Sequence, residues 1–292
     1  MARGEVNAVV VGSDRCAQNG DIINKVGTYP LALMAKEFGV PFFALVQDPG
    51  NLASGADVHI EERPASELLS FQGQPLVRDG AERLAGRYPA FDVTPSSLIT
   101  YLVGFDELFT PESFRQKFLK SSSAPAKHEE ESREKYLLVF GVPKYFDFLA
   151  RELKDQRARG ILVAEMRPKL WGAQVVAPPL LQRDVPTTLI SDNMMGTLFA
   201  QRRIQRLYLF FKELSKKGPV GICGSLLAWL LARAHGVPVE LIESSGPEEH
   251  ATDADVSTFL GRKVIPAGVS LHRIEKEIIP WALLRGDKGA RP

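Results

Sequence analysis

One segment, residues 6–41, indicates the fold class: VNAVVVGSDRCAQNGDIINKVGTYPLALMAKEFGVP. It begins with an apolar, largely β-branched run over residues 6–11, which Gly12 ends, and such a run is typical of a parallel strand covered on both faces. A helical pattern follows and stops at residues 38–41, Phe-Gly-Val-Pro. Strand, polar turn and helix in this order predict an α/β protein with Rossmann-like parallel sheets.

The polar turn after the first strand is the candidate site, because open α/β sheets bind ligands beyond the carboxyl ends of their strands. Six polar residues crowd this end: Asp14, Arg15, Asn19, Asp21, Asn24 and Lys25. On spacing alone, a turn carboxylate paired with Arg15 explains Asp14 equally well, and a solvated helix face explains Lys25. Cys16 is better explained as a small buried apolar group than as a reactive thiol.

The remaining elements of the first 120 residues are shorter. We expect one helix or two short ones over residues 21–38, and Pro30 favours a break near Thr28. Strands are expected at residues 41–46 and 56–61, with a helical turn at residues 66–71. Residues 92–95 are typical of a helix start that leads into residues 96–102.

A second α/β pattern follows a change of composition. Residues 121–135 are polar and charged without an apolar period, so we interpret them as a linker. Beyond them, strands at residues 136–140, 160–164 and 187–190 alternate with helices at residues 144–157 and 175–182, which predicts βαβ units. We therefore expect a half-unit in residues 1–120 and a second Rossmann-like unit in residues 136–285.

Composition narrows the functional classes. The chain has 292 residues, 45% of them hydrophobic and 24% charged, as in soluble proteins with one large or two ordinary domains. A formal net charge of +1 provides no field that recruits nucleic acid or an anionic membrane.

The two cysteines, Cys16 and Cys223, are too few for a disulfide framework. No signal peptide or membrane span is evident, so we expect a cytoplasmic protein. The histidines lack metal-ligand spacing and no nucleotide fingerprint occurs, so no cofactor is expected.

Several motifs resemble one superfamily. They are Gly12-Ser13-Asp14-Arg15, Asn19-Gly20-Asp21, residues 24–29 and Gly39-Val40-Pro41, with further matches at residues 60–63, 89–95 and 98–100. Residues 165–168, 172–173 and 186–194 match as well. The superfamily contains the methylthioribose-1-phosphate isomerases, the ribose-1,5-bisphosphate isomerases and the alpha, beta and delta subunits of translation initiation factor 2B.

The order of these motifs differs from that of the family. Elements similar to residues 136–199 precede the Gly-Ser-Asp-Arg strand in the family, whereas here they follow it. Residues 204–267 look like a degenerate second copy of residues 6–90: Gly27 precedes Pro41 by 14 residues, and Gly224 precedes Pro238 by 14. The second copy has Phe-Phe-Lys-Glu at residues 210–213 where the first has the polar turn. The chain is thus predicted to hold one half-unit with an intact polar site and one degenerate full unit, related by internal repetition.

Three arrangements are compatible with this order. Residues 136–199 could complete the first half in a circularly permuted sheet. Alternatively, residues 136–284 fold as their own domain and residues 1–110 pack on it as the partner half of a pseudo-dimer, which the continuous chain from residue 191 to 204 favours. In the third arrangement an upstream half-unit precedes Met1, which lies at the repeat boundary.

The resemblance implies an aldose–ketose isomerase of a sugar 1-phosphate, similar to methylthioribose-1-phosphate isomerase and acting in methionine salvage. It implies that Asp14 is catalytic and exchanges a proton with a substrate oxygen, and that Asn24 and Lys25 contact the substrate. Arg15 and Asp192 are further substrate-binding candidates. The expected partners are a phosphorylated pentose or a related small molecule, and a second copy in a homo-dimer or the pseudo-dimer described above.

Two departures from the family support an alternative function. The family's catalytic Cys lies on the strand whose counterpart here is residues 136–140, Tyr-Leu-Leu-Val-Phe, which contains no Cys. The Arg-Gly phosphate loop of the family's N-terminal helical domain has no counterpart either. The alternative is a non-catalytic binding or regulatory protein that resembles the initiation factor subunits. Glu165 and Arg167, like Asp192, then either join a pocket or form an Arg–carboxylate pair that orients loops.

Overall fold

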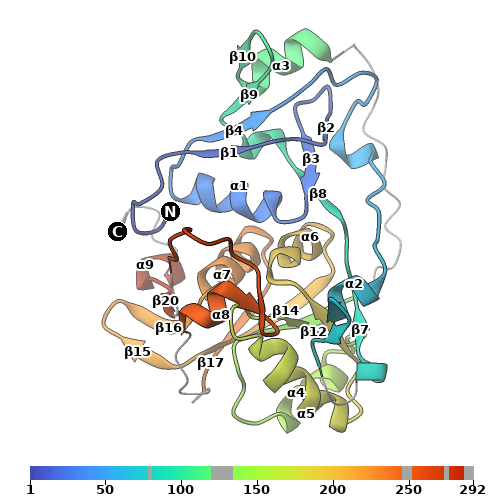
Figure 1. The fold of residues 1–292 in the computed structure, drawn as a ribbon, viewed down its shortest axis with the longest axis vertical. Coiled ribbons are helices and arrows are strands. Elements are labelled where there is room, and N and C mark those ends of the chain that lie inside the picture. The colour runs from blue at the N-terminus through green and yellow to red at the C-terminus, as the bar shows by residue number, and fades with distance from the viewer. Residues whose placement is uncertain (78–80, 120–133, 245–251, 273–275, 286–292) are drawn as a thin grey trace. The chain divides into compact units, whose positions relative to one another are not determined.

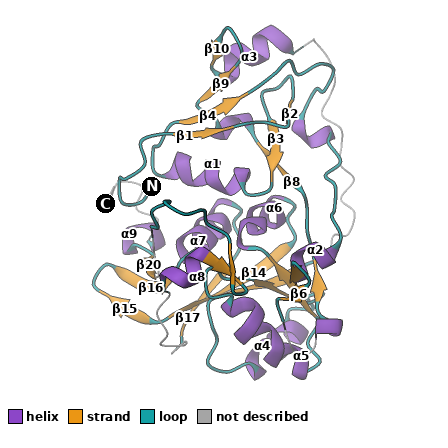
Figure 2. Cartoon of the chain, viewed as in Figure 1, coloured by secondary structure: helices purple, strands orange, loops and turns teal. Residues whose placement is uncertain are grey.

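The computed structural model describes residues 1–77, 81–119, 134–244, 252–272 and 276–285, and mixes helices with strands throughout (Figures 1 and 2). The chain divides into two compact units. Unit 1 contains residues 1–62 and the described residues that follow residue 88, up to 119; unit 2 contains the described parts of residues 63–88 and 134–285. The predicted linker at residues 121–135 lies outside the described residues, except for its last two.

Unit 1 is built on a four-stranded sheet with the order β1-β4-β9-β10. The strands are β1 (Val9–Val11), β4 (Phe42–Leu45), β9 (Tyr101–Val103) and β10 (Leu108–Phe109). The first three are parallel, and β10 runs antiparallel to β9. The expected strands at residues 6–11 and 41–46 are therefore confirmed, and their carboxyl ends lie at the same edge of the sheet.

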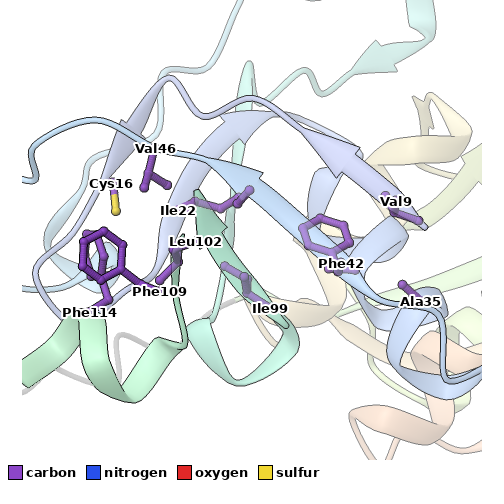
Figure 3. Close-up of a cluster of buried hydrophobic side chains, with 12 residues drawn as sticks. Val9, Cys16, Ile22, Ala35, Phe42, Val46, Ile99, Leu102, Phe109 and Phe114 are labelled. Carbon is purple, nitrogen blue, oxygen red and sulfur yellow. The ribbon is translucent and has the colours of Figure 1, made fainter. Parts of the chain in front are cut away.

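The hydrophobic core of unit 1 lies where helix α1 (Thr28–Glu37) packs against β1 and β4 (Figure 3). Val9 and Phe42 of the sheet and Ala35 of the helix belong to this cluster, together with Cys16 and Ile22. Burial of a large apolar side chain contributes roughly 1.5–3 kcal/mol. The segment around the candidate site is therefore anchored by its apolar residues.

A second, antiparallel sheet in unit 1 corrects two predictions. It consists of β2 (Arg15–Cys16), β3 (Ile22–Lys25) and β8 (Phe91–Thr94). Residues 22–25 are thus a strand and not the start of a helix, and residues 91–94 are a strand and not a helix start. The expected break near Thr28 is confirmed, because α1 begins there with Pro30 in its first turn, where a missing N–H is tolerated.

Two further expectations about unit 1 are wrong. Residues 55–57 form a short 3-10 helix capped by Ser54, and no strand follows at residues 58–61. Residues 96–98 form another 3-10 helix, after which the chain enters β9. In both places the apolar residues are too few to sustain a longer regular element.

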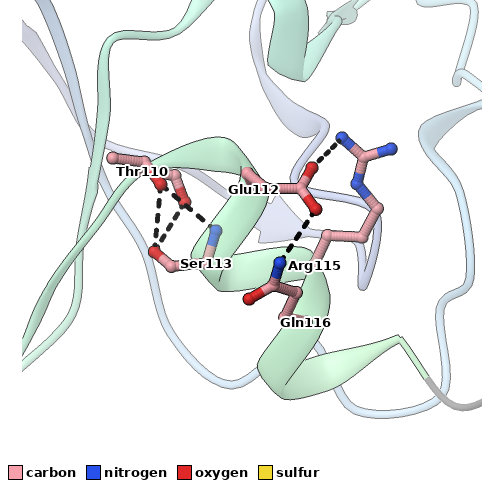
Figure 4. Close-up of polar contacts among 5 residues, drawn as sticks. All are labelled: Thr110, Glu112, Ser113, Arg115 and Gln116. Atoms are coloured by element: carbon pink, nitrogen blue, oxygen red, sulfur yellow. Dashed lines mark hydrogen bonds and ion pairs between the residues drawn. The ribbon is translucent and has the colours of Figure 1, made fainter.

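Helix α3 (Pro111–Phe118) ends the described part of unit 1 and has a well-defined N-terminal cap (Figure 4). The hydroxyl of Thr110 accepts the backbone N–H of Ser113 at 3.2 Å, and Pro111 occupies the first helical position. The carboxylate of Glu112 accepts hydrogen bonds from Arg115 at 2.9 Å and from Gln116 at 3.1 Å. These contacts stabilise the first turn, while Phe114 is buried in the core.

Unit 2 contains a six-stranded parallel sheet with the order β17-β14-β11-β12-β13-β7. The strands in chain order are β7 (Ala85–Gly86), β11 (Tyr136–Phe140), β12 (Ile161–Ala164), β13 (Thr187–Ile190), β14 (Ile204–Phe211) and β17 (Val239–Glu243). The predicted Rossmann-like α/β class is confirmed. Residues 63–88 depart from the predicted half-unit 1–120, because β7 pairs with β13 and so belongs to this sheet.

Helices connect the strands of unit 2. They are α4 (Asp147–Asp155), α5 (Ala177–Gln182), α6 (Met195–Ala200) and α7 (Ser225–Ala234), and a π-helical turn over Gly172–Val176 leads into α5. The helices expected at residues 144–157 and 175–182 are found within these bounds. Residues 136–243 supply five of the six strands of this sheet and β7 supplies the sixth, so the choice among the three arrangements stays a prediction.

Several small elements complete unit 2. The three-stranded sheet contains β15 (Glu213–Ser215), β16 (Gly218–Ile222) and β20 (Lys276–Ile278). Two short helices each lead into a hairpin: α2 (Ala65–Leu69) into β5 (Ser70–Phe71) and β6 (Gln74–Pro75), and α8 (Asp253–Ser257) into β18 (Thr258–Phe259) and β19 (Arg262–Lys263). Helix α9 (Trp281–Leu284) ends the described chain.

A similar series of elements occurs in both units. The series β1-β2-β3-α1-β4 in unit 1 has the same order as β14-β15-β16-α7-β17 in unit 2. Each helix follows a glycine with positive φ, 109° at Gly27 and 97° at Gly224, a conformation that favours glycine. A carboxylate from a distant strand accepts N–H groups at each helix start, Asp92 for α1 and Glu277 for α7. That the two series descend from one duplicated sequence stays a prediction.

Candidate functional site

Asp14 lies at the carboxyl end of β1, in the turn that the sequence singled out. The neighbouring Ser13 hydroxyl donates to the carbonyl of Leu45, at the end of β4, at 2.8 Å. The backbone N–H of Asp14 donates to the carbonyl of Ile23 at 3.0 Å, and its carbonyl accepts from the side chain of Gln47 at 3.4 Å. The backbone of Asp14 is thus fixed while its side chain is exposed to solvent. A fixed, accessible carboxylate at this edge is able to exchange protons with a ligand.

Asn24 lies on β3, directly beside this turn, because the carbonyl that Asp14 contacts belongs to the Ile23–Asn24 peptide. Its side-chain amide donates to the hydroxyl of Thr28 at 3.1 Å, at the start of α1. Its amide oxygen is an acceptor, and the second amide hydrogen is a further donor. The structure therefore brings Asp14 and Asn24 to adjacent segments at the amino end of α1.

Lys25 and Arg15 take different positions. Successive side chains of a strand point to opposite faces, so Lys25, paired with Phe91, lies on the face of β3 opposite Asn24, which pairs with Asp92. The ammonium group of Lys25 lies 5.4 Å from the centre of the Phe91 ring, a cation–π distance. Arg15 pairs with Ile23 and its side chain is exposed. The candidate residues thus divide between two faces of one small sheet.

Asp21 and Asn19 serve the loop structure. One oxygen of the Asp21 carboxylate accepts the N–H of Ser96 at 2.9 Å, and the other accepts from Asn19 at 2.8 Å and from the N–H of Gly55 at 3.2 Å. The backbone N–H of Asp21 in turn donates to the side-chain oxygen of Asn19 at 3.1 Å. These bonds hold three segments of unit 1 together, which explains two of the six polar residues without a ligand.

Asp92 is a buried carboxylate that the sequence analysis missed. It is 1% exposed and accepts the N–H of Gly27 at 2.7 Å and that of Tyr29 at 3.1 Å. Burial raises the pKa of Asp92 to about 7, against the opposing effect of the backbone N–H groups of Gly27, Tyr29 and Thr28. The sequence pattern that could have identified it is the alternation Phe-Asp-Val-Thr at residues 91–94. This alternation is typical of a strand with Asp and Thr on one face.

Asp192 follows β13 in unit 2, and its carboxylate accepts the backbone N–H groups of Met166 and Arg167, both at 2.8 Å. It thereby ties the loop after β12 to the end of β13, by backbone bonds and not by a contact with the Arg167 side chain. Burial raises the pKa of Asp192 to about 6, and burial together with the charge of Asp192 raises the pKa of Glu165 to about 7. Asp14 and Asp192 belong to different units.

Neither thiol is suited to acid–base chemistry. Cys16 is 3% exposed within the core of unit 1 (Figure 3), and burial followed by the charge of Asp21 raises its pKa to about 12. Burial followed by the charge of Glu277 likewise raises the pKa of Cys223 to about 12. The interpretation of Cys16 as a small buried apolar group therefore agrees with its environment.

Among the residues that the structure describes, no three His, Cys, Asp or Glu side chains are grouped so that they could hold a metal ion. Within the same residues, no helix has the length and apolar character needed to cross a membrane.

Comparison with known proteins gives one family and several relatives. The sequence model described as the Initiation factor 2 subunit family matches residues 1–104 and 134–242. The methylthioribose-1-phosphate isomerase of Ostreococcus lucimarinus is 50% identical over 107 residues, which are 35% of this chain and 28% of that protein. The isomerase of Thermus thermophilus is 50% identical over 107 residues, which are 35% of this chain and 31% of that protein. The chain therefore spans less than a third of the curated relatives it matches.

Two of the solved structures with detectable similarity are the following. The delta subunit of translation initiation factor eIF-2B from A. fulgidus has a TM-score of 0.44 and 14% identity, with 50% of this chain and 49% of that chain covered. The 5-methylthioribose 1-phosphate isomerase of Pyrococcus horikoshii has a TM-score of 0.36 and 38% identity, covering 39% of this chain and 32% of that chain.

Proposed function

The chain belongs to the Initiation factor 2 subunit family, and we propose that it acts as an aldose–ketose isomerase of a sugar 1-phosphate, similar to methylthioribose-1-phosphate isomerase. The observation that carries this proposal is the 50% identity with such isomerases over 107 residues. The position of Asp14, exposed at the carboxyl end of β1 and beside Asn24, supports it, because parallel sheets bind ligands at that edge.

The proposed chemistry moves a hydrogen between C1 and C2 of the sugar and needs a group that exchanges protons with the substrate oxygens. Asp14 is that group. Asn24 binds a substrate hydroxyl through its free amide positions, while the cations of Arg15 and Lys25 attract the phosphate. That Asp192 of unit 2 binds a substrate stays a prediction; its oxygens accept the backbone N–H groups of Met166 and Arg167.

A second candidate function is favoured by one observation. The strand where the family resemblance implies a catalytic Cys is β11, whose residues Leu137–Phe140 are all apolar and buried. Cys16, the thiol nearest in sequence to Asp14, is held in its neutral form by burial. The alternative is therefore a non-catalytic binding or regulatory protein of the same family.

The experiment that separates the two functions is a coupled assay of the full chain with methylthioribose 1-phosphate and with ribose 1,5-bisphosphate. We expect turnover of the first substrate. A thermal-shift titration with the same compounds is run in parallel. Stabilisation without turnover of either compound by folded protein would rule out the isomerase and leave the binding protein.

A further inference from the structure

A cavity in unit 2 is lined in part by Arg167 and does not include Asp14 or Asn24. It is formed between the loop that follows β12 and the segment that contains α8 and the β18–β19 hairpin, and its volume is about 480 Å³. Pockets of roughly 300–1,000 Å³ are typical of small-molecule sites. From the loop, Arg167, Lys169 and Trp171 line the cavity, and from the other segment Thr258 and Leu260 do so.

Arg167 is a charged residue of this cavity, and among the described residues one of its guanidinium nitrogen atoms has no hydrogen-bond acceptor. Its guanidinium carbon lies 4.5 Å from the centre of the Phe259 ring, so the planar group is held by stacking. Within the part of the chain that the structure describes, its Nη1 atom is buried and has no hydrogen-bond acceptor. Because Arg167 also lines the cavity, the positive charge of its guanidinium group favours an anionic oxygen there.

The charges around Arg167 indicate a single negative charge on the ligand. Lys169 and Asp255 form an ion pair at 3.2 Å, so these two lining residues largely neutralise each other. Glu165 and Asp192 also act on Arg167; burial raises their pKa values to about 7 and about 6, so near neutral pH both still carry negative charge that offsets part of the Arg167 charge. Little positive charge is left for a ligand, and a monoanion therefore suits the cavity better than a phosphate dianion.

The rest of the lining is a mixture of apolar and hydrogen-bonding groups. Trp171, Leu260 and Val175 offer apolar surface, while the amide of Gln174 and the hydroxyl oxygen of Thr258 are available near it. The Thr258 hydroxyl donates to the carbonyl of Ala254 at 2.8 Å, so only its acceptor lone pairs remain for a ligand. An apolar body with one anionic end fits this arrangement.

We propose that this cavity is a binding site for a small carboxylic acid with an aromatic or branched apolar body. The carboxylate contacts the guanidinium group of Arg167, and the body packs against Trp171 and Leu260. The site is independent of Asp14 and of the proposed isomerase activity.

The test is isothermal titration calorimetry of the full chain at pH 7 with phenylacetate and 4-methylpentanoate, and with inorganic phosphate and a nucleoside monophosphate as competing chemistries. We expect saturable binding of a carboxylate and weaker binding of both phosphates. Arg167→Met should weaken carboxylate binding about tenfold or more, because it removes the charge and keeps an apolar stem. Arg262→Met is the matched control, since Arg262 is on the same hairpin and does not line the cavity; it should leave binding unchanged.

A second variant keeps the test decisive if Arg167→Met does not fold. Gln174 is exposed at the cavity, so Gln174→Trp should fold, occupy the space and reduce carboxylate binding about tenfold or more. Absence of saturable carboxylate binding would overturn the proposal. So would unchanged binding by folded Arg167→Met or Gln174→Trp, or tighter binding of either phosphate compound. Because binding is measured and not turnover, these outcomes are separate from those of the isomerase assay.

Discussion

Three consecutive residues of the candidate turn have different environments. Asp14 and Arg15 are exposed, whereas Cys16 points into the apolar cluster that contains Phe42 and Ile22. Burial stabilises the neutral thiol of Cys16, whereas the side chain of Asp14 is accessible to solvent. Any proton exchange at this turn therefore depends on Asp14, and Cys16 contributes packing.

For Asp14 we expect that the Asp14→Asn variant loses turnover and keeps most of its binding. Asn preserves shape and hydrogen bonding but cannot accept the proton, so kcat should fall by about 100-fold or more with KM changed less than about threefold. Steady-state kinetics on methylthioribose 1-phosphate measure both constants. Asp106→Asn, an exposed control in the β9–β10 turn, should behave as wild type. Equal kcat for Asp14→Asn and wild type would remove Asp14 from the mechanism.

For Cys16 the expected effect is on stability. Cys16→Ser places a hydroxyl in the apolar core of unit 1, so the free energy of unfolding should fall by about 1–2 kcal/mol. Turnover of the folded variant should stay within about threefold of wild type, since the thiol with its pKa of about 12 takes no part in proton exchange. Urea unfolding and the same kinetic assay give the two numbers. A large loss of kcat with unchanged stability would mean that the thiol is catalytic.

At the scale of elements, several parallel strands were predictable, whereas β9 and the antiparallel strands β3 and β8 were not. β1, β4, β11 and β12 are apolar runs bounded by turn residues, a local signal. β3 carries Ile22-Ile23-Asn24-Lys25 just before a helix, and it becomes a strand by pairing with β8, some seventy residues away in the chain. Local propensity does not encode such a partner, which is why residues 22–25 were assigned to a helix.

The candidate site likewise combines features with a local sequence signal and features that depend on strand pairing with a distant segment. The position of Asp14 at a strand end follows from Gly12 ending an apolar run, so the turn was predictable. The separation of Asn24 from Lys25 depends on β3 being a strand, because alternation places neighbours on opposite faces. The contact of Asp92 with the start of α1 depends on β8 and was therefore missed. Residues 56–61 were assigned to a strand from composition alone, without a pairing partner.

Gly224 should be much less tolerant of substitution than Gly39, although both have positive φ values, 97° and 64°. A Cβ atom at Gly224 would lie 2.6 Å from Cζ of Phe140, whereas at Gly39 nothing lies within 4 Å. Gly39→Ala should therefore cost about 1–2 kcal/mol from backbone strain, and Gly224→Ala about 2 kcal/mol more from the clash. Chemical denaturation of both variants measures the difference. Equal costs would show that Phe140 moves freely.

At the scale of the whole molecule, each unit uses one distant carboxylate to hold the start of a helix. Asp92 of β8 binds the start of α1, and Glu277 of β20 binds the N–H groups of Gly224 and Leu226 at 3.0 and 3.1 Å. Negative charge at a helix N-terminus is favourable, by roughly 0.3–1 kcal/mol at exposed sites. Unit 2 has Phe211-Lys212 at the end of β14, where unit 1 has the polar turn after β1, and both units have a contact of this kind. We infer that the contact serves the fold, since it does not require the candidate site residues.

The unfolding of the chain should depend on pH through the buried carboxylates of unit 2. The pKa values of Glu165 and Asp192 are raised to about 7 and about 6, above those of an unfolded chain at roughly 4. The folded state therefore binds protons more tightly, so the stability from these groups is fully present below about pH 4 and is lost as pH rises to about 7. Each unit of pKa shift corresponds to about 1.4 kcal/mol.

Glu165→Gln resembles the protonated form, so it should lose less stability between pH 5 and pH 8 than wild type does. Glu82→Gln, at an exposed position, should follow the wild-type curve. Urea unfolding at both pH values measures the losses, and equal losses for Glu165→Gln and wild type would mean that Glu165 is ionised in the folded chain throughout this range.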